Sequence, residues 1–406
     1  MDLFYFYQFI ISVVLAVLLI NFLFNLYLFR NIRNYSNKDE ILINQPLVSI
    51  LIPARNEERN IERCLKSILN QDYKNTEIIV LDDNSVDKTG EIVRKMAKKD
   101  SRIRLISGKP LPQGWLGKSF ACFQLSQYAK GDYLIFTDAD TYHFSSSVKS
   151  ALSCLIINKL DAACPFPRQI MVSLSEKMAI PFINFAILLF MPLALIRKSK
   201  NPLFCTGVGQ YFIFRREAYF GMGGHAAVKG KILEDVHIAK KTKEAGFSYM
   251  IYDGSSSLTC RMYKSFHEVW KGYSRFMFSA FDYNFITMTI VLILVTIFLF
   301  MPFVFLPLGV FVYDWSPVIM TFIILQVSII SIIRICISLR FKENPLNVLI
   351  HPLAMIFIVL VSINSFIQSK LGSGISWKGR TYQAQSHCND LNVFEEDIEE
   401  FKIKNH

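Results

Sequence analysis

The stretch "VSILIPARNEERNIERCLKSIL", residues 48–69, decides the fold that the sequence predicts. It begins with a short apolar run, Val48–Ile52, which is typical of a buried strand, and Pro53 is expected to end that strand. Apolar side chains then return at the spacing of a helix, at Ile61, Leu65, Ile68 and Leu69. A strand, a polar loop and a helix in this order form the first unit of an α/β fold.

The same order recurs along the chain. Residues 76–97, "TEIIVLDDNSVDKTGEIVRKMA", predict a second strand, an acidic turn and a helix from about Asp87. A third strand is expected within 103–109, a helix within 117–131, and a fourth strand in "DYLIFTDAD", residues 132–140. This alternation predicts a Rossmann-like, mainly parallel sheet with helices on its faces, in which ligands bind at the carboxyl ends of the strands.

Polar side chains follow the expected strands where the strands end: Arg55, Asn56 and Glu57, then Asp82 and Asp83, then Asp138 and Asp140. The glycine-rich motifs that cradle phosphates are missing from the first turn. In an extended segment Asp138 and Asp140 would point to the same side. A hard cation such as Mg²⁺ or Mn²⁺ could bind both carboxylates together with substrate phosphates. The alternative is a solvated loop with an incidental pair of acids.

The composition indicates that part of the chain lies in a membrane. Of 406 residues, 52% are hydrophobic and 19% are charged, with a mean hydropathy of +0.32; soluble domains carry about 25% charged residues. Four runs approach or exceed the roughly 20 residues that span a bilayer: Leu3–Phe29, Ile286–Tyr313, Trp315–Ile333 and Pro345–Ser369. We therefore expect an N-terminal transmembrane anchor (1–30), about three transmembrane helices (284–369) and a polar tail (370–406).

Arg30, Arg33 and Lys38 follow the first run, so the positive-inside rule predicts a multi-pass protein of the cell membrane whose globular part, residues 45–280, is cytoplasmic. The net charge of +11 fits anionic headgroups, and no basic-aromatic module predicts nucleic acid as a partner. The run 178–196 lies inside the globular part, so we expect an interfacial or re-entrant segment. A buried core helix is the alternative. The side of the tail stays open: one run could be re-entrant, or 286–313 could be a broken pair.

Four ordered blocks resemble family 2 glycosyltransferases of the GT-A fold: "IPARNEERNI" (52–61), "VLDDNSVDKT" (80–89), "FTDAD" (136–140) and "LEDVHIAKK" (233–241). Further stretches are similar to bacterial carotenoid glycosyltransferases, those acting on a C30 carotenoid acid above all, and to hopanoid-associated relatives. They are "LPQGWLGKSFAC" (111–122), "RMY" (261–263), "EVWKGYSR" (268–275) and "WKGRTY" (377–382).

The resemblance implies a role for individual residues. Those expected to bind the nucleotide-sugar are Pro53, Arg55, Glu57, Asp83, Lys118 and Asp138. Asp140, with Asp138, would hold the metal ion, and Asp235 would be the catalytic base with Glu234 beside it. Lys118 could instead be a surface lysine, and the two acids at 234–235 could simply complement a helix dipole. His225 is the histidine expected nearest the pocket, and Gly207 and Gly209 could admit a sugar or form a bulge.

The function that the resemblance implies is an inverting, metal-dependent transfer of a sugar, glucose from UDP-glucose by default, to a lipid-like acceptor. A C30 carotenoid acid is the first candidate; a hopanoid or glycerolipid acceptor, a processive polysaccharide synthase, and a non-catalytic transporter or scaffold are the alternatives. The Gln-x-x-Arg-Trp motif of processive synthases is missing, since Lys271-Gly272 follows Trp270, which favours one sugar per acceptor. Trp270 and Arg275 would face the acceptor or anchor the chain among headgroups.

Overall fold

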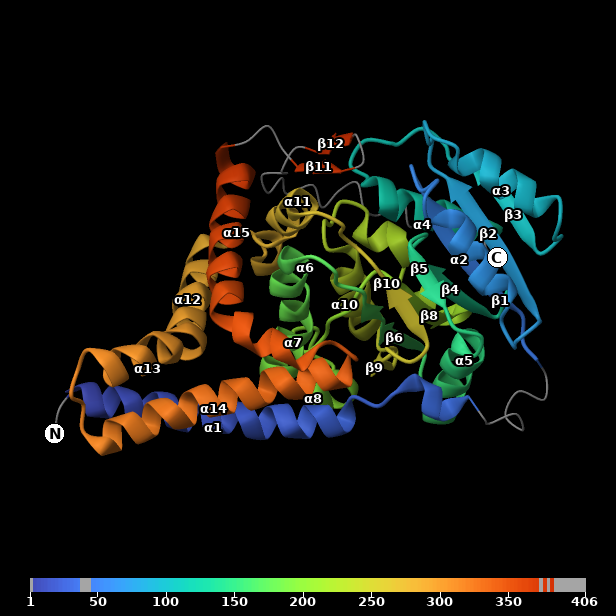
Figure 1. The fold of residues 1–406 in the computed structure, drawn as a ribbon. Coiled ribbons are helices and arrows are strands. Elements are labelled where there is room, and N and C mark those ends of the chain that lie inside the picture. Colours follow the sequence, from blue (N-terminus) through green and yellow to red (C-terminus); the bar gives the residue numbers. More distant parts are fainter. Residues whose placement is uncertain (1–2, 37–44, 372–374, 378–379, 383–406) are drawn as a thin grey trace.

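The computed structural model describes residues 3–36, 45–371, 375–377 and 380–382. An α/β body lies beside a group of long helices (Figure 1). The body is built on a seven-stranded sheet of order β3-β2-β1-β4-β8-β6-β9. Its strands are β1 (Val48–Ala54), β2 (Thr76–Asp82), β3 (Ile103–Ser107), β4 (Tyr133–Thr137), β6 (Ala162–Phe166), β8 (Tyr211–Arg215) and β9 (Tyr249–Asp253).

The first four strands in the chain are parallel, and β8 runs antiparallel to both of its neighbours, β4 and β6. The predicted fold class, a Rossmann-like, mainly parallel sheet together with apolar helices, is confirmed. Smaller sheets are formed by β5 (Thr141–His143), β10 (Leu258–Cys260) and β7 (Arg168–Gln169), and by β11 (Ile375–Trp377) with β12 (Arg380–Tyr382).

The predicted end of the first strand is wrong. β1 continues through Pro53, which pairs with Leu81 of β2. On its other side β1 pairs with β4 only as far as Leu51. A proline lacks a backbone N–H, and it is tolerated here because β1 has only one neighbour at that point.

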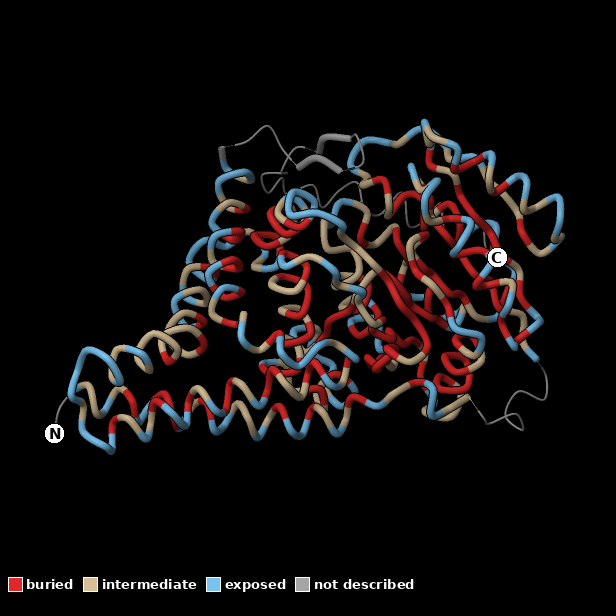
Figure 2. Tube along the Cα trace, viewed as in Figure 1, coloured by how far each residue is buried: buried red, intermediate tan, exposed pale blue. Residues whose placement is uncertain are grey.

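Helices flank the sheet on both faces (Figure 1), which is why its central strands are apolar throughout and buried (Figure 2). They are α2 (Ile61–Leu69), α3 (Thr89–Ala97), α4 (Gly117–Tyr128), α5 (Ser147–Asn158), α9 (Arg216–Gly221) and α10 (Glu234–Glu244). A further helix, α11 (Phe266–Phe276), connects the body to the long helices.

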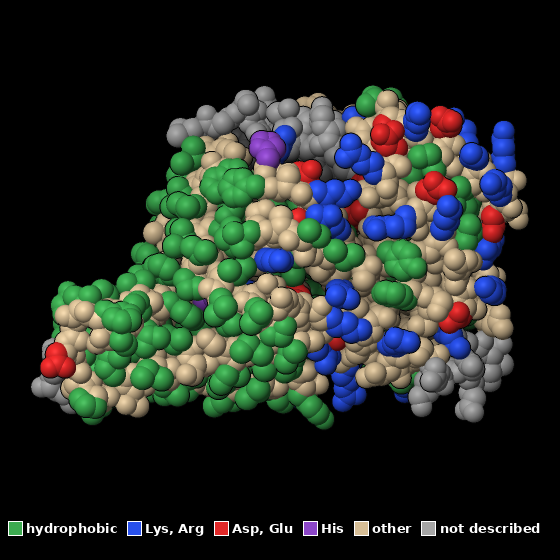
Figure 3. All heavy atoms as spheres, viewed as in Figure 1, with side chains coloured by type: hydrophobic (Ala, Val, Ile, Leu, Met, Phe, Trp, Pro, Cys, Tyr) green, Lys and Arg blue, Asp and Glu red, His purple; other side chains and the backbone are tan. Residues whose placement is uncertain are grey.

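Among the described residues, four helical runs are long and apolar enough to cross a membrane: Leu3–Leu28, Phe285–Phe311, Pro317–Arg340 and Pro345–Lys370. They contain α1 (Leu3–Leu28), α12 (Phe285–Val295), α13 (Met301–Phe311), α14 (Pro317–Arg340) and α15 (His351–Leu371). Hydrophobic side chains cover this part of the surface, whereas lysines and arginines gather on the α/β body (Figure 3).

The second run is not straight. α12 and α13 are joined by a π-helical turn at Thr296–Phe300, and Pro302 lies directly after it. The helix bends here because π-turns and prolines disrupt the regular hydrogen-bond ladder. As a result, α13 lies along α1 and α14 (Figure 1). In contrast, α12 lies beside α15, which runs across the direction of α1 and α14.

The run 178–196 falls within three short helices, α6 (Leu174–Ala179), α7 (Pro181–Phe190) and α8 (Leu193–Lys198). Side-chain amides of α1 hold the break between α7 and α8. Asn25 Nδ2 donates to the carbonyl of Leu188 at 2.9 Å, and its Oδ1 accepts from the N–H of Leu193 at 2.9 Å. Asn21 Nδ2 donates to Leu189 O at 2.8 Å. The segment is therefore attached to the end of α1.

Candidate active site

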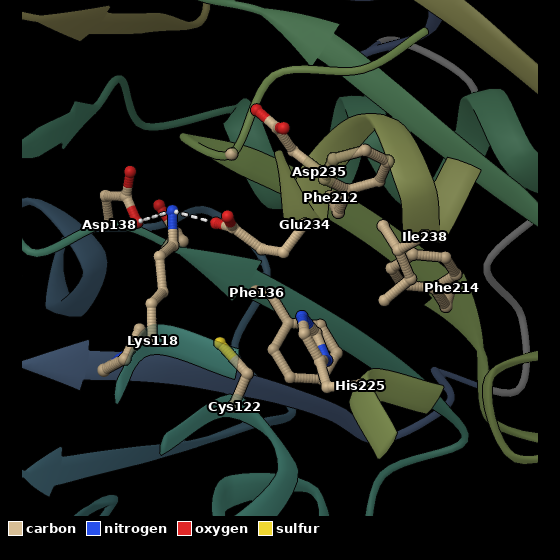
Figure 4. A pocket seen from close by; sticks show the side chains of 13 residues that line it. Lys118, Cys122, Phe136, Asp138, Phe212, Phe214, His225, Glu234, Asp235 and Ile238 are labelled. Carbon is tan, nitrogen blue, oxygen red and sulfur yellow. Dashed lines mark ion pairs between the residues drawn. The ribbon is translucent and has the colours of Figure 1, made fainter. Parts of the chain in front are cut away.

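A cavity opens at the carboxyl ends of β1 and β4, where the first turns of α4 and α10 also lie (Figure 4). It is lined by Pro53, Lys118, Cys122, Phe136, Thr137, Asp138, Gly209, Phe212, Phe214, His225, Glu234, Asp235 and Ile238. Five of the residues that the sequence predicted, at positions 53, 118, 138, 234 and 235, thus meet in one place. This is the edge at which parallel sheets bind their ligands.

Lys118 lies at the centre of the cavity. Its Nζ is 2.8 Å from Asp138 Oδ1 and 3.2 Å from Glu234 Oε1 (Figure 4). Burial alone would lower the pKa of the Lys118 ammonium, but the two carboxylates raise it well above its ordinary value. Lys118 is therefore a charged residue of the cavity, not the surface lysine that was the alternative.

Gly209 makes room for this cluster. A Cβ added at Gly209 would lie 2.5 Å from Lys118 Nζ and 3.6 Å from both Asp235 Oδ2 and Glu234 Oε1. The charged ends of three side chains are thus gathered around one glycine just before β8. The sequence left open whether the glycine admits a sugar or forms a bulge. In the structure, the groups that lie close to Gly209 are the protein's own charged side chains.

Asp235 follows Glu234 in the first turn of α10. Its Oδ1 accepts a hydrogen bond from the N–H of Val236 at 2.8 Å. Burial and the neighbouring Glu234 carboxylate raise the pKa of Asp235 to about 7, against the opposing effect of the Lys118 charge. A carboxylate that can exchange a proton near neutral pH is chemically suited to general base catalysis.

The Asp-x-Asp pair is arranged differently from the prediction. Residues 138–140 form a turn, closed by a hydrogen bond from Thr141 N–H to Asp138 O at 3.1 Å, because the chain here leaves the large sheet and enters β5. The extended geometry that would have put both carboxylates on one side is therefore absent. Asp138 faces Lys118, while Asp140 lies beside Cys260 of β10.

Both carboxylates act on the Cys260 thiol. Burial raises the pKa of the Cys260 thiol well above its ordinary value, and the charges of Asp140 and Asp138 both add to that effect. Within the described ranges, no group of three or more His, Cys, Asp or Glu side chains could hold a metal on its own. Two carboxylates in a tight turn do fit a hard ion such as Mg²⁺ or Mn²⁺ that binds jointly with phosphate oxygens.

The remaining predicted nucleotide-binding residues lie on two loops beside the cavity. Arg55 Nη1 donates to the carbonyls of Asp83, at 2.5 Å, and Asn84, at 3.1 Å. Glu57 N–H donates to Thr89 Oγ1 at 2.7 Å. These bonds tie the loop after β1 to the loop after β2. Asp83 is almost fully buried between them, so these loops can present a preformed edge to a ligand.

Trp270 and Arg275 lie on α11, outside the cavity. The Trp270 ring packs edge-on against Phe357 of α15, with ring centroids 5.7 Å apart. Arg275 lies near Tyr263, whose pKa burial raises to about 12; the Arg275 charge lowers it, and the Asp140 charge raises it. Arg275 and Asp140 thus both act on Tyr263.

The sequence reasoning missed the apolar floor of the cavity, formed by Cys122, Phe136, Phe212, Phe214 and Ile238. Phe212 and Phe214 alternate along β8, which is a core signal and gave no hint of a site. His225, which the sequence did favour, contacts the Phe136 ring at 4.7 Å between centroids. Burial and the Lys118 charge lower the pKa of His225 to about 3, so it is neutral.

The chain is similar to known proteins. Residues 49–220 match the family described as "Glycosyl transferase family 2". The 4,4'-diaponeurosporenoate glycosyltransferase of Staphylococcus haemolyticus is 26% identical over 54% of this chain and 57% of its own length. Its Staphylococcus aureus (strain USA300) counterpart is 22% identical over 87% of this chain and 92% of its own.

An uncharacterized glycosyltransferase of Haemophilus influenzae is 34% identical over 29% of this chain and 46% of its own length. The chain thus spans about half the length of two of these relatives and most of the third. A solved mannosyltransferase from Pyrobaculum calidifontis, in complex with GDP-Man and Mn²⁺, aligns with a TM-score of 0.47 at 17% identity over 78% of this chain and 98% of that chain. Residues 49–220 are therefore a domain of glycosyl transferase family 2.

Proposed function

We propose that the protein moves one hexose from a nucleotide-sugar to a lipid-like acceptor at the cytoplasmic face of the cell membrane, with inversion at the anomeric carbon. UDP-glucose is the first candidate for the donor, and a C30 carotenoid acid is the first candidate for the acceptor. The observation that carries the proposal is the cluster of Lys118, Asp138, Glu234 and Asp235 at the carboxyl edge of the sheet, next to helices apolar enough to cross a membrane.

The donor would lie along the two tied loops and the cavity. Pro53, Arg55, Glu57 and Asp83 would bind the nucleotide. Lys118 would turn from the two carboxylates toward the diphosphate, since an ammonium on a flexible stem can move between anions. Asp140 and Asp138 would hold a Mg²⁺ or Mn²⁺ ion, which when bound supplies neutralisation of the charge that develops on the leaving diphosphate.

Asp235 would act on the acceptor. For a hydroxyl acceptor, Asp235 takes the proton while the oxygen attacks the anomeric carbon from the face opposite the leaving diphosphate, so an α-linked donor gives a β-linked product. A carboxylic acid acceptor is already ionised near neutral pH and needs no base. In that case Asp235 serves mainly to orient the sugar, and Glu234 positions Lys118 through their ion pair.

The attachment of the α/β body to apolar helices supports a lipid acceptor. The α/β body is attached to apolar helices by α11 and by the segment 178–196, and the positive charges after α1 favour a cytoplasmic body. Two of the similar proteins are named for a carotenoid acid acceptor. The same chemistry would also fit a hopanoid or glycerolipid, which differ in the group that receives the sugar.

The test is mass spectrometry of lipids after incubation of the full-length protein with UDP-glucose, Mn²⁺ and a membrane lipid extract containing a carotenoid acid. We expect one added hexose on one lipid class, lost on chelation of the metal and in an Asp140→Asn variant. A polymer made from the donor alone would instead identify a processive synthase. Donor hydrolysis unchanged by chelation would contradict the metal dependence.

A further inference from the structure

We infer that the hydrocarbon chain of the acceptor binds in a groove between α12 and α15, with its reactive end directed toward α11 and the carboxylate cluster. The inference rests on the proposed function and names the binding site that it requires. The groove has a volume of about 620 Å³. Ligand sites commonly measure roughly 300–1,000 Å³, so its size is that of a binding site, not of a packing defect.

The side chains that line the groove favour a hydrocarbon chain over a polar headgroup. They consist of Phe285, Met288, Thr289, Leu292, Ile293, Thr296 and Ile297 from the α12 side, and Val359, Ile363, Phe366 and Ile367 from α15. The hydroxyl of Thr296 already donates to Leu292 O at 2.8 Å. None of the described residues that line it is charged, so an occupant gains free energy here by burying apolar surface.

The surface of α12 and α15 around the groove is apolar. Ile290 and Leu294 on α12, and Leu360 on α15, are exposed apolar side chains outside the groove. Hydrophobic side chains cover the surface of the long helices (Figure 3). A hydrocarbon chain in the membrane can therefore enter the groove without passing through water. A water-soluble ligand or a folded protein partner could not enter in this way.

One end of the groove is fastened to the body of the enzyme. The Phe366 ring lies tilted against Phe285, with centroids 4.7 Å apart, and edge-on to Phe278, with centroids 5.2 Å apart. The N–H of Phe278 donates to Ser365 Oγ at 2.9 Å, and Asn364 Nδ2 donates to Ser274 Oγ at 2.7 Å. This end therefore has a fixed position relative to α11.

The same end is connected to the active site through α11. The Tyr273 ring of α11 lies 6.0 Å from the Tyr263 ring between centroids. Tyr263 is three residues beyond Cys260, which lies beside Asp140. Arg275 follows Ser274 on α11. A chain held in the groove would thus bring its head to Arg275, whose charge suits a carboxylate.

The test compares two tryptophan variants on one helix. Leu292→Trp fills the groove, whereas Ile290→Trp places the same side chain on the outer, exposed face of α12. The probe is parinaric acid, a long polyene carboxylic acid whose fluorescence rises in an apolar site, added to the full-length protein in detergent. We expect saturable binding in the wild type and in Ile290→Trp, and about tenfold weaker binding in Leu292→Trp, a loss of about 1.4 kcal/mol.

Val359→Trp fills the groove from the α15 side and should repeat the effect, which guards against a folding defect in one variant. Metal-dependent hydrolysis of UDP-glucose is measured in the same samples, and Ile290→Trp should hydrolyse the donor at the wild-type rate. The inference that the groove binds the acceptor would be overturned if Leu292→Trp and Ile290→Trp bound parinaric acid equally. It would also be overturned if the wild type showed no saturable binding. If the wild type did not hydrolyse UDP-glucose, the proposed function would be overturned instead.

Discussion

The carboxyl edge of the sheet and the contact between α1 and α14 use polar side chains in opposite ways. At the sheet edge, Lys118 lies between Asp138 and Glu234, and all three side chains stay partly accessible. Between the helices, Gln326 Nε2 donates to Gln8 Oε1 at 2.9 Å and to Ser12 Oγ at 3.0 Å, and these residues are buried.

The difference separates polar groups that can meet a ligand from those that hold the fold. An ion pair with access to solvent contributes little to stability, so its partners can exchange for a substrate at small cost. A buried amide between apolar helices has no such freedom, because breaking its hydrogen bonds leaves unsatisfied groups. Substitutions at the sheet edge should therefore change catalysis, and substitutions among the helices should change stability.

The largest effect is expected from Asp140→Asn. Neutralisation of the leaving diphosphate by a metal is worth several kcal/mol, so the variant should lose about a thousandfold in kcat at 1.36 kcal/mol per factor of ten. The measurement is hexose transfer followed by mass spectrometry, with Mn²⁺ binding by electron paramagnetic resonance as a readout free of turnover. If the affinity for Mn²⁺ were unchanged in the variant, Asp140 would not be a metal ligand.

Lys118→Met should cost about a hundredfold in kcat, the usual loss for removing one group that stabilises developing charge. Lys118→Arg is the matched control, since it keeps the charge but changes the geometry, and it should retain more activity. Thermal unfolding should shift little in either variant because the ion pairs of Lys118 are partly accessible. A large drop in the melting temperature with normal kcat would make Lys118 a structural residue.

Gly209→Ala should reduce kcat about tenfold by displacing the Lys118 ammonium, which lies 2.5 Å from the added Cβ. Because the effect acts through Lys118, it should nearly disappear when Lys118 is already methionine. A double-mutant cycle measures this coupling. Additive losses in the double variant would show that Gly209 acts on the sugar or on Asp235 independently of the lysine.

The effect of Asp235→Asn depends on the acceptor. Asp235 has a pKa of about 7, so it is protonated and unable to accept a proton below that pH. With a hydroxyl acceptor the wild-type rate should therefore fall as the pH drops through about 7, and the variant should lose about a hundredfold or more. With a carboxylic acid acceptor the loss should stay below about tenfold, and this pH dependence should be weak.

Sequence patterns predicted the first four strands of the large sheet and the helices between them, because each of these elements is decided by nearby residues. The strand at 76–82 and the helix at 61–69 lie within a residue or two of where their apolar periods placed them. The Lys118–Glu234 ion pair could not be derived from spacing, because it joins residues far apart in the chain. Nor could the turn at 138–140, which depends on β5 pairing with the distant β10.

The smallest effect on catalysis, and a clear effect on stability, is expected from Asn25→Ala in α1. Asn25 is fully buried and makes hydrogen bonds to Leu188 O, Met191 O and Leu193 N–H. Removing its side chain leaves these backbone groups unsatisfied, which should lower the free energy of unfolding by about 1–3 kcal/mol. Asn21→Ala, which removes a single bond to Leu189 O, is the matched control and should cost less. Unfolding in detergent gives the stability, and kcat at a permissive temperature should be unchanged in both. If Asn25→Ala lowered kcat while leaving the unfolding transition in place, the helix contact would belong to the catalytic machinery, and the division between the two regions would fail.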